Sequence, residues 1–262
     1  MMNSVNKTLY IPLFGKALVS KKGIILSDKK AEEIIGKEEF LLKGKAKSKW
    51  LAYFMAMRST VFDNWLKEKA KEHSNAIILH FGAGLDSRVE RVNLQENLFV
   101  DIDFPAVIEE KKRYFFESEN YKMIGADIRE ESLFSLLPNS ENAIAIFEGI
   151  SMYLTNDELK NILSSLSKKY KNLSVLLDCY TTFGAKMSKM KNPVKSVGVK
   201  EVYGLKDHKV LEEKTSLSFI KEHSLSQYIL SSSTVLVNFF QCFISANFPG
   251  KFKKNRYFYH YM

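Results

Sequence analysis

The stretch AIILHFGAGLDSR, residues 76–88, joins a short apolar run to two glycines that stand one residue apart. Gly82 and Gly84 lack a Cβ atom, so the backbone there can turn sharply and lie close to a ligand. Ser87 and Glu90 have the S-x-x-E spacing of a capping box, which predicts a helix start directly after the turn. The stretch therefore predicts a strand, a glycine turn that is open to a ligand, and a helix.

Further short apolar runs follow this first one, and amphipathic stretches such as 105–118 and 156–170 separate them. This alternation is typical of βαβ units on a parallel sheet. After it, the pattern predicts helices near 211–223 and 235–247. We expect a doubly wound, mostly parallel, seven-stranded α/β sheet. Its strands are expected at 76–81, 97–100, 122–124, 143–147, 173–177, 227–230 and 256–262.

The chain of 262 residues is long enough to bury a sizeable core and fits a single domain. Within it we expect an N-terminal helical cap over residues 1–75 and a core of βαβ units over 76–180. Residues 181–262 are expected to hold a lid insertion, at 181–210, and to complete the sheet.

Composition and charge limit the classes of partner and the cellular location that we expect. The net charge is +9, but the lysines are spread along the chain, which favours a solvated basic surface over a nucleic-acid site. The longest apolar stretch, 234–248, contains polar residues, and the N-terminus has no signal-peptide pattern, so we expect a cytoplasmic protein with no membrane span. Cys179 and Cys242 are expected to be reduced, buried thiols. Neither the cysteines nor the histidines have the spacing of a metal site.

Acidic residues stand at or just after the later apolar runs, where ligands bind in open α/β sheets. They would repel a pyrophosphate, and GAGLDS lacks the third glycine of GxGxxG, so a dinucleotide is disfavoured. A cofactor with a ribose diol, a positive charge and no phosphate fits better, as in S-adenosylmethionine. The alternative is that the acids only cap helices. The acids are Asp101, Asp103, Asp127, Glu148 and Asp178.

Arg58 occupies one helical face together with Phe54, Val61, Phe62 and Trp65, at spacings of three and four residues. An arginine within an apolar stripe is costly unless it is paired. Arg58 therefore either pairs with a buried acid or holds an anionic ligand, such as the carboxylate of the cofactor.

Six segments together resemble the leucine carboxyl methyltransferase and TcmP-like O-methyltransferase family of class I S-adenosylmethionine enzymes. The resemblance covers about residues 8 to 210 and implies a Rossmann-like methyltransferase fold. The segments are TLYIPLFGKALVSKKGIILSDKKAEEII (8–35), MRSTVFD (57–63), HFGAGLDSR (80–88), DIDFPAVIEEKKR (101–113), GADIRE (125–130) and EGISMYL (148–154).

The resemblance implies that S-adenosylmethionine is the cofactor and S-adenosylhomocysteine the product. It assigns the carboxylate end of the cofactor to Lys16 and Arg58, and the ribose to Asp103. The other residues that it implies are the glycine turn of Gly82, Ala83 and Gly84, the adenine-side pair Asp127 and Ile128, and the acid Glu148 after the fourth strand.

The expected activity is O-methylation of a carboxyl or hydroxyl group of a small molecule, such as a polyketide-like metabolite. A carboxylate, with a reference pKa of about 4, needs no base, whereas a phenol, with a pKa of about 10, would benefit from one. Tyr153 is a candidate for contact with the acceptor or for core packing, and His208 lies near the expected lid. The alternatives are a methyltransferase directed at RNA or a protein C-terminus, and a cofactor-binding protein without catalysis.

Overall fold

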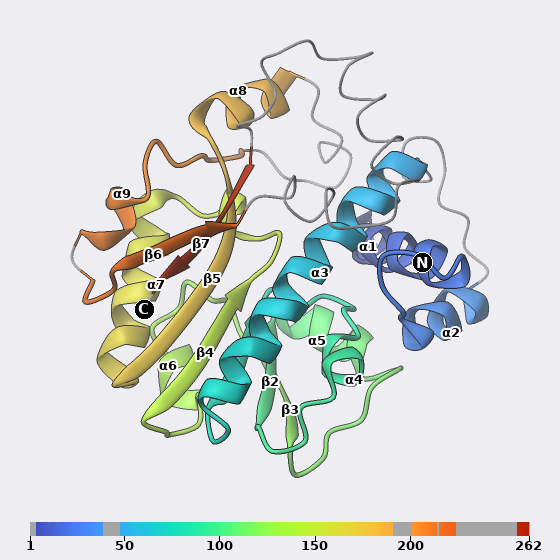
Figure 1. The fold of residues 1–262 in the computed structure, drawn as a ribbon, viewed down its shortest axis with the longest axis horizontal. Helices are drawn as coiled ribbons and strands as arrows, with labels where there is room; N and C mark the ends of the chain where they lie inside the picture. Colours follow the sequence, from blue (N-terminus) through green and yellow to red (C-terminus); the bar gives the residue numbers. More distant parts are fainter. Residues whose placement is uncertain (1–3, 39–47, 191–200, 214, 224–255, 262) are drawn as a thin grey trace.

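The computed structural model describes residues 4–38, 48–190, 201–213, 215–223 and 256–261 (Figure 1). The strands are β1 (Ile77–Phe81), β2 (Phe99–Asp103), β3 (Tyr121–Gly125), β4 (Asn142–Phe147), β5 (Asn172–Tyr180), β6 (Phe219–His223) and β7 (Arg256–Tyr261). The N-terminal helices are α1 (Ser4–Lys21), α2 (Lys29–Lys37) and α3 (Lys49–Glu72). The others are α4 (Arg88–Val92), α5 (Pro105–Lys111), α6 (Leu133–Leu136), the 3-10 helix η2 (Ser151–Tyr153), α7 (Asn156–Lys169), α8 (Thr182–Met190) and α9 (Lys209–Glu212).

The strands form one sheet in the order β3-β2-β1-β4-β5-β7-β6. Neighbours from β3 to β5 pair in parallel, while β7 is antiparallel to both β5 and β6. The expected parallel α/β architecture is confirmed for these five strands. The chain moves outward from β1 to β3 and then places β4 on the other side of β1. Ligands bind at such a switch in strand order.

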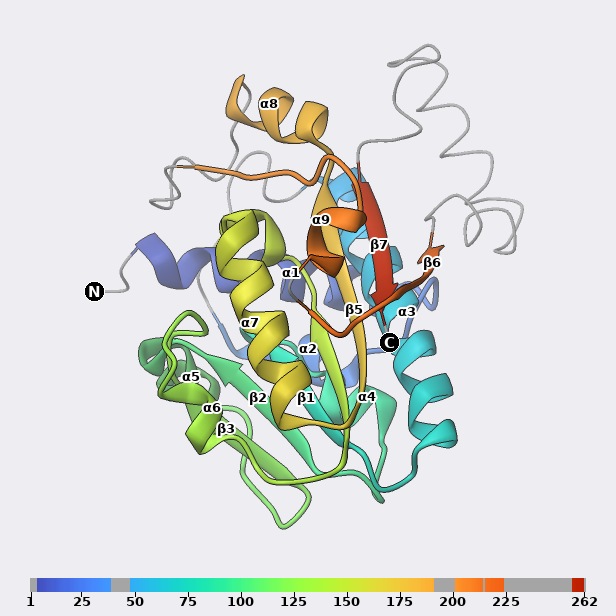
Figure 2. The same ribbon diagram turned by 90° about the vertical axis from the view of Figure 1, so that its left-hand side faces the viewer.

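Side chains alternate across β1 and divide the core into two layers, because successive residues of a strand point to opposite faces. Leu79 packs in one cluster with Leu163 of α7, and Ile78 packs in the other with Phe62 of α3. Figure 2 shows α7 on one face of the sheet and α3 on the other. Helices thus cover both faces, as expected for a doubly wound sheet.

The expected helix over 211–223 is wrong. Helix α9 ends at Glu212, and residues 219–223 form β6, which pairs with β7 in an antiparallel register. Pairing of the backbone with a distant strand overrides the local helical pattern. The expected strand at 227–230, the expected helix at 235–247 and Cys242 lie outside the described residues. The same holds for residues 191–200 of the expected lid.

The expected capping box at Ser87 and Glu90 is also wrong, because the side chain of Ser87 makes no cap hydrogen bond to α4. The Ser87 hydroxyl instead contacts the carboxylate of Asp28, at 2.6 Å from Oδ1. Asp28 is the N-cap of α2 and accepts a hydrogen bond from Ala31 N–H at 2.9 Å. Ser87 therefore ties the glycine turn to the N-terminal helices.

Within the described part of the chain, no helix combines the length and the apolar character needed to cross a bilayer.

Candidate functional site

A cavity of about 280 Å³ lies at the carboxyl ends of β1, β2 and β4. Apolar side chains from α1, from the loop after β1 and from the loop after β4 form part of its wall. These are Leu9, Pro12, Leu13, Leu85 and Ile150. The cavity also brings together eight of the residues singled out from the sequence. They are Lys16, Arg58, Gly82, Ala83, Gly84, Asp103, Glu148 and Tyr153.

The glycine turn after β1 uses backbone conformations that suit glycine. Gly82 has φ +65° and Gly84 has φ +50°, both in the left-handed region. A Cβ atom on Gly82 would lie 2.1 Å from Ile150 Cγ2, which leaves no room for a side chain. The turn therefore lets β1 end directly at the cavity, with the loop after β4 packed against it.

Asp103, the last residue of β2, is held by two backbone groups. Gly84 N–H donates to Oδ2 at 2.8 Å, and Phe104 N–H donates to Oδ1 at 2.7 Å. Burial raises the pKa of Asp103, although these two hydrogen bonds oppose the rise. Because each carboxylate oxygen can accept more than one hydrogen bond, both oxygens can also accept from a diol in the cavity.

Asp101 is two residues earlier in β2, yet it belongs to a buried network. Its carboxylate contacts His80 Nδ1 at 2.8 Å, Tyr121 Oη at 2.6 Å and Lys111 Nζ at 2.6 Å. Burial would raise the pKa of Asp101, but the charge of Lys111 and the hydrogen bond from His80 outweigh burial and lower it to about 2. This set of partners gives Asp101 a structural role and leaves Asp103 at the cavity.

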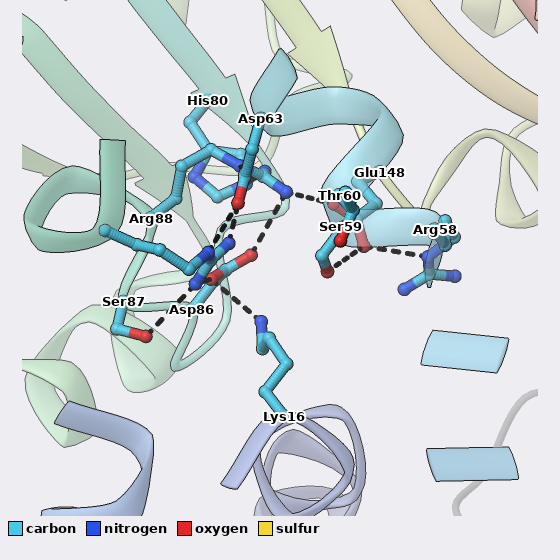
Figure 3. Close-up of polar contacts among 12 residues, drawn as sticks. Lys16, Arg58, Ser59, Thr60, Asp63, His80, Asp86, Ser87, Arg88 and Glu148 are labelled. Carbon is cyan, nitrogen blue, oxygen red and sulfur yellow. Dashed lines mark hydrogen bonds and ion pairs between the residues drawn. The ribbon is translucent and has the colours of Figure 1, made fainter. Parts of the chain in front are cut away.

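Arg58 and Glu148 both line the cavity and contact each other (Figure 3). Arg58 Nε donates to Glu148 Oε1 at 2.8 Å, and Arg58 Nη1 lies 3.6 Å from Asp178 Oδ2. Ser59 also donates to Oε1 at 2.9 Å, and Arg88 Nη2 donates to Oε2. Burial opposes ionisation of Glu148, but Arg88 and Arg58 outweigh burial and hold its pKa well below its usual value.

The two alternatives considered for Arg58 are therefore compatible. Arg58 pairs with a buried acid, Glu148, and the same side chain lines the cavity. The guanidinium also lies close to Gly149, whose φ of +78° belongs to the left-handed region. A Cβ atom on Gly149 would be 3.0 Å from Arg58 Nη1. The glycine therefore leaves the space that the guanidinium occupies.

Lys16 and Asp86 form a second ion pair in the cavity wall, with Nζ 2.8 Å from Oδ1. Burial lowers the pKa of Lys16, although Asp86 counteracts this. Burial opposes ionisation of Asp86, but Lys16, Arg91 and Arg88 outweigh it and lower its pKa well below the usual value. Sequence reasoning missed Asp86 and Arg88, although both stand in the stretch GAGLDSR. The signal was a set of charged residues directly after the turn.

Three candidates are not among the described residues that line the cavity. Asp127 follows β3, and its carboxylate is held by the guanidinium of Arg129, with Nε 2.9 Å from Oδ1. Ile128 is partly buried and packs against the hydrophobic core cluster that contains Leu79. His208 precedes α9 and stacks on Phe219, with ring centroids 4.1 Å apart.

The described charged residues that line the cavity comprise two cations and three carboxylates. His80 also lines it, and burial lowers the pKa of His80 below its ordinary value of 6.5. Counted by formal charges, the lining therefore has one negative charge in excess. Such a lining opposes a pyrophosphate and favours a ligand with net positive charge. Among the described residues, no group of three or more His, Cys, Asp or Glu is placed to hold a metal ion.

Comparisons with known proteins show relatives in sequence and in fold. The tetracenomycin polyketide synthesis O-methyltransferase TcmP of Streptomyces glaucescens is 24% identical over 227 residues, which are 86% of this chain and 84% of the relative. The S-adenosyl-L-methionine-dependent methyltransferase dpfgK of Gibberella zeae is 22% identical over 191 residues, 66% of this chain and 64% of that protein. The crystal structure of a DUF574 family protein from Streptomyces avermitilis has the same fold, with a TM-score of 0.58 at 11% identity, and covers 79% of this chain and 82% of its own.

The model of the family described as leucine carboxyl methyltransferase matches residues 4–167, which is more than half of the chain. This range contains α1, the glycine turn, and every described charged residue that lines the cavity. The resemblance of the sequence motifs is therefore confirmed, and the chain is a methyltransferase that belongs to the leucine carboxyl methyltransferase family.

Proposed function

We propose that this enzyme transfers the methyl group of S-adenosylmethionine to a carboxyl or hydroxyl oxygen of a small molecule. S-adenosylmethionine is the methyl donor, in keeping with the family and with its relatives. The single observation that carries the proposal is the lining of the cavity. It combines a glycine turn, a carboxylate fixed for a diol and one excess negative charge.

This lining fits the donor at each of its ends. S-adenosylmethionine carries a sulfonium, an ammonium and a carboxylate, so its net charge is positive, opposite to that of the cavity. We assign the ribose hydroxyls to Asp103, the carboxylate to Arg58 and Lys16, and the ammonium to Glu148. The backbone of Gly82, Ala83 and Gly84 lies against the centre of the donor. This assignment gives the carboxylate and the ammonium of the donor each a partner of opposite charge in the cavity.

The adenine side is assigned to residues beyond β3. Asp127 and Ile128 follow this strand, which pairs with β2, so they lie at the same edge of the sheet as Asp103. Ala126 N–H donates to Asp103 O at 2.9 Å, which fixes the start of that loop beside the ribose acid. A ligand that extends from Asp103 toward β3 would reach this loop.

The bound donor supplies a methyl group on a sulfonium, and its transfer is an in-line displacement. The protein then has to align the acceptor with the methyl group and exclude water. His80 is not available as a base, because its Nε2 lies 2.9 Å from Arg88 Nη1 and its Nδ1 lies 2.8 Å from Asp101 Oδ1. Arg88 can only donate, so Nε2 is already used as an acceptor.

This arrangement favours a carboxylate as the acceptor, since a carboxylate is already ionised near neutral pH. Tyr153 lines the cavity and is 40% exposed. We assign it to contact with the acceptor, whereas His208 is not among the described residues that line the cavity and we assign it no role.

Calorimetry with S-adenosylhomocysteine, S-adenosylmethionine and NAD tests the binding part of the proposal. We expect both sulfur compounds to bind and NAD not to bind, because its pyrophosphate meets the carboxylates. Comparable affinity for NAD would refute the assignment. For the acceptor, mass spectrometry of a metabolite extract incubated with enzyme and donor should reveal a product that has gained one methyl group. Methylation of RNA or of a protein C-terminus instead would refute the small-molecule acceptor, and donor binding without any methylated product would refute catalysis.

A further inference from the structure

Arg88 is completely buried and is not among the described residues that line the cavity, yet its guanidinium reaches both walls of it. Its Nε donates to Asp63 Oδ1 of α3 at 2.7 Å. Its Nη1 lies 2.9 Å from His80 Nε2 of β1, and its Nη2 donates to Glu148 Oε2 after β4. Figure 3 shows the guanidinium between these three partners. One side chain therefore connects α3, β1 and the end of β4.

The contact with His80 determines where the proton of the imidazole lies. A guanidinium has no acceptor, so His80 Nε2 must accept the hydrogen bond and Nδ1 must carry the proton. Nδ1–H then donates to Asp101 Oδ1 at 2.8 Å. Lys111 Nζ, 2.6 Å from Asp101 Oδ2, anchors the other end. Arg88 is thus held from the buried side by a neutral histidine, and its charge is directed to the carboxylates.

Because of the contact with Arg88, the two carboxylate oxygens of Glu148 have different partners. Oε1 accepts from Arg58 Nε and Ser59 Oγ, at 2.8 and 2.9 Å, whereas Oε2 accepts from Arg88. Without Arg88, both oxygens could turn toward Arg58 and form a bidentate ion pair with its guanidinium. That pair would neutralise the guanidinium and remove the carboxylate from the ammonium position.

We propose that Arg88 is a positioning residue that fixes Glu148, so that the cavity presents a separate carboxylate and guanidinium to the amino-acid end of the cofactor. The inference rests on the proposed function, since it concerns the same site. Arg88 also lies 3.4 Å from Asp86, but Arg91 contacts Asp86 as well, so the contact with Glu148 is what distinguishes Arg88. Because Asp86 pairs with Lys16, both contacts concern the amino-acid end, and Arg88 should affect ligands that carry the amino-acid group and leave the adenosine end unchanged.

Arg91 provides a matched control on the same helix. It is also buried, and it pairs with Asp63 at 2.5 Å, Asp28 at 2.8 Å and Asp86 at 3.0 Å. None of its described contacts involves Glu148. Arg88→Lys and Arg91→Lys therefore each replace a planar guanidinium in the same network by an ammonium group, and both keep the positive charge. Only the first change releases Glu148.

The experiment measures the dissociation constants of S-adenosylhomocysteine and 5′-methylthioadenosine by calorimetry, together with the melting temperature. Methylthioadenosine keeps the adenosine and the thioether but lacks the amino-acid end. We expect Arg88→Lys to weaken S-adenosylhomocysteine about tenfold, which corresponds to about 1.4 kcal/mol, with methylthioadenosine changed less than about twofold. Arg91→Lys should lower the melting temperature to a similar extent and leave the ratio of the two affinities unchanged.

A double-mutant cycle with Glu148→Gln tests whether Arg88 acts through Glu148. If it does, Arg88→Lys should not weaken S-adenosylhomocysteine further in the Glu148→Gln background. Additive losses, or equal losses for the two ligands in Arg88→Lys, would overturn the proposal. If Arg88→Lys does not fold, Asp63→Asn provides a second route, because it loosens Arg88 at Nε; an unchanged ratio of affinities in that variant would also overturn it. Failure of the wild-type enzyme to bind either ligand would instead refute the proposed function.

Discussion

Replacing Asp103 by alanine separates the ribose from the rest of the site. The carboxylate of Asp103 lines the cavity and is fixed by Gly84 N–H at 2.8 Å and by Phe104 N–H at 2.7 Å. Since a hydrogen bond to a charged group contributes about 1.5–3 kcal/mol, losing the ribose contact should weaken S-adenosylhomocysteine between about tenfold and about 150-fold. Folding should suffer little, because burial raises the pKa of Asp103 and its charge is therefore not stabilised by the fold.

Asp101→Ala is the comparison that makes this result specific. Asp101 is 0% exposed and pairs with Lys111, which is also 0% exposed. Removing one partner of a buried ion pair destabilises a protein by about 3–5 kcal/mol. At about 2–4 °C per kcal/mol, the melting temperature of the ligand-free protein should fall by roughly 6–20 °C.

Calorimetry with S-adenosylhomocysteine and thermal melting of both ligand-free variants decide the matter. We expect Asp103→Ala to lose affinity and keep its melting temperature, and Asp101→Ala to lose its melting temperature. The reasoning is refuted if Asp103→Ala binds S-adenosylhomocysteine as tightly as the wild type. It is equally refuted if Asp101→Ala melts normally and binds more weakly than Asp103→Ala.

Substitutions at three further positions, one of them combined with a change at Ile150, test the glycines and the buried histidine. Gly82 has φ +65°, and a Cβ atom there would lie 2.1 Å from Ile150 Cγ2, so Gly82→Ala should lower the free energy of unfolding by at least about 1–2 kcal/mol. Adding Ile150→Ala should restore only the part of this loss that comes from the steric clash with Ile150. Urea unfolding measures both changes. Gly149→Ala places a Cβ atom 3.0 Å from Arg58 Nη1, so calorimetry should show weaker S-adenosylhomocysteine with methylthioadenosine unchanged. Burial lowers the pKa of His80 below 6.5, so the unfolded chain binds more protons than the folded chain below that pH. The stability of the wild type should therefore fall as the pH drops below 6.5, and His80 contributes at most about 1.4 kcal/mol per pH unit to this fall. Urea unfolding at about pH 7.5 and about pH 5.5 should give a smaller decrease for His80→Gln, and an equal decrease would contradict the buried, neutral histidine.

The parallel sheet was predictable because strands that are buried on both faces form continuous apolar runs. Residues 143–147 are such a run, residues 173–177 are interrupted only by Ser174, and the two segments lie within β4 and β5. The C-terminal part was less predictable. Residues 219–223 form a strand because β7, more than thirty residues later in the chain, pairs with them. A local helical pattern contains no information about such a partner.

Residues of the site could be predicted where their role depends on their own backbone conformation or on their place at the end of a strand. Residues whose role depends on a partner far away in the sequence were harder to predict. Gly82 and Asp103 could be placed from the turn and from the strand end. Ser87 could not, because its partner Asp28 lies 59 residues away and replaces the local cap. Arg88 was missed for the same reason, since Glu148 is 60 residues from it in the sequence.

The buried ion pairs around the cavity also explain why charge, rather than shape alone, should select the ligand. A buried ion pair adds little net stability, because desolvation of the two ions offsets their attraction. Lys16 with Asp86, and Arg58 with Glu148, therefore contribute mainly by holding charges in fixed positions. Asp103 then leaves one carboxylate without a cation among the described charged residues of the lining. A ligand with net positive charge restores the balance, whereas a ligand with two phosphates would add repulsion, so the discrimination between S-adenosylmethionine and NAD should weaken when Asp103 is neutralised.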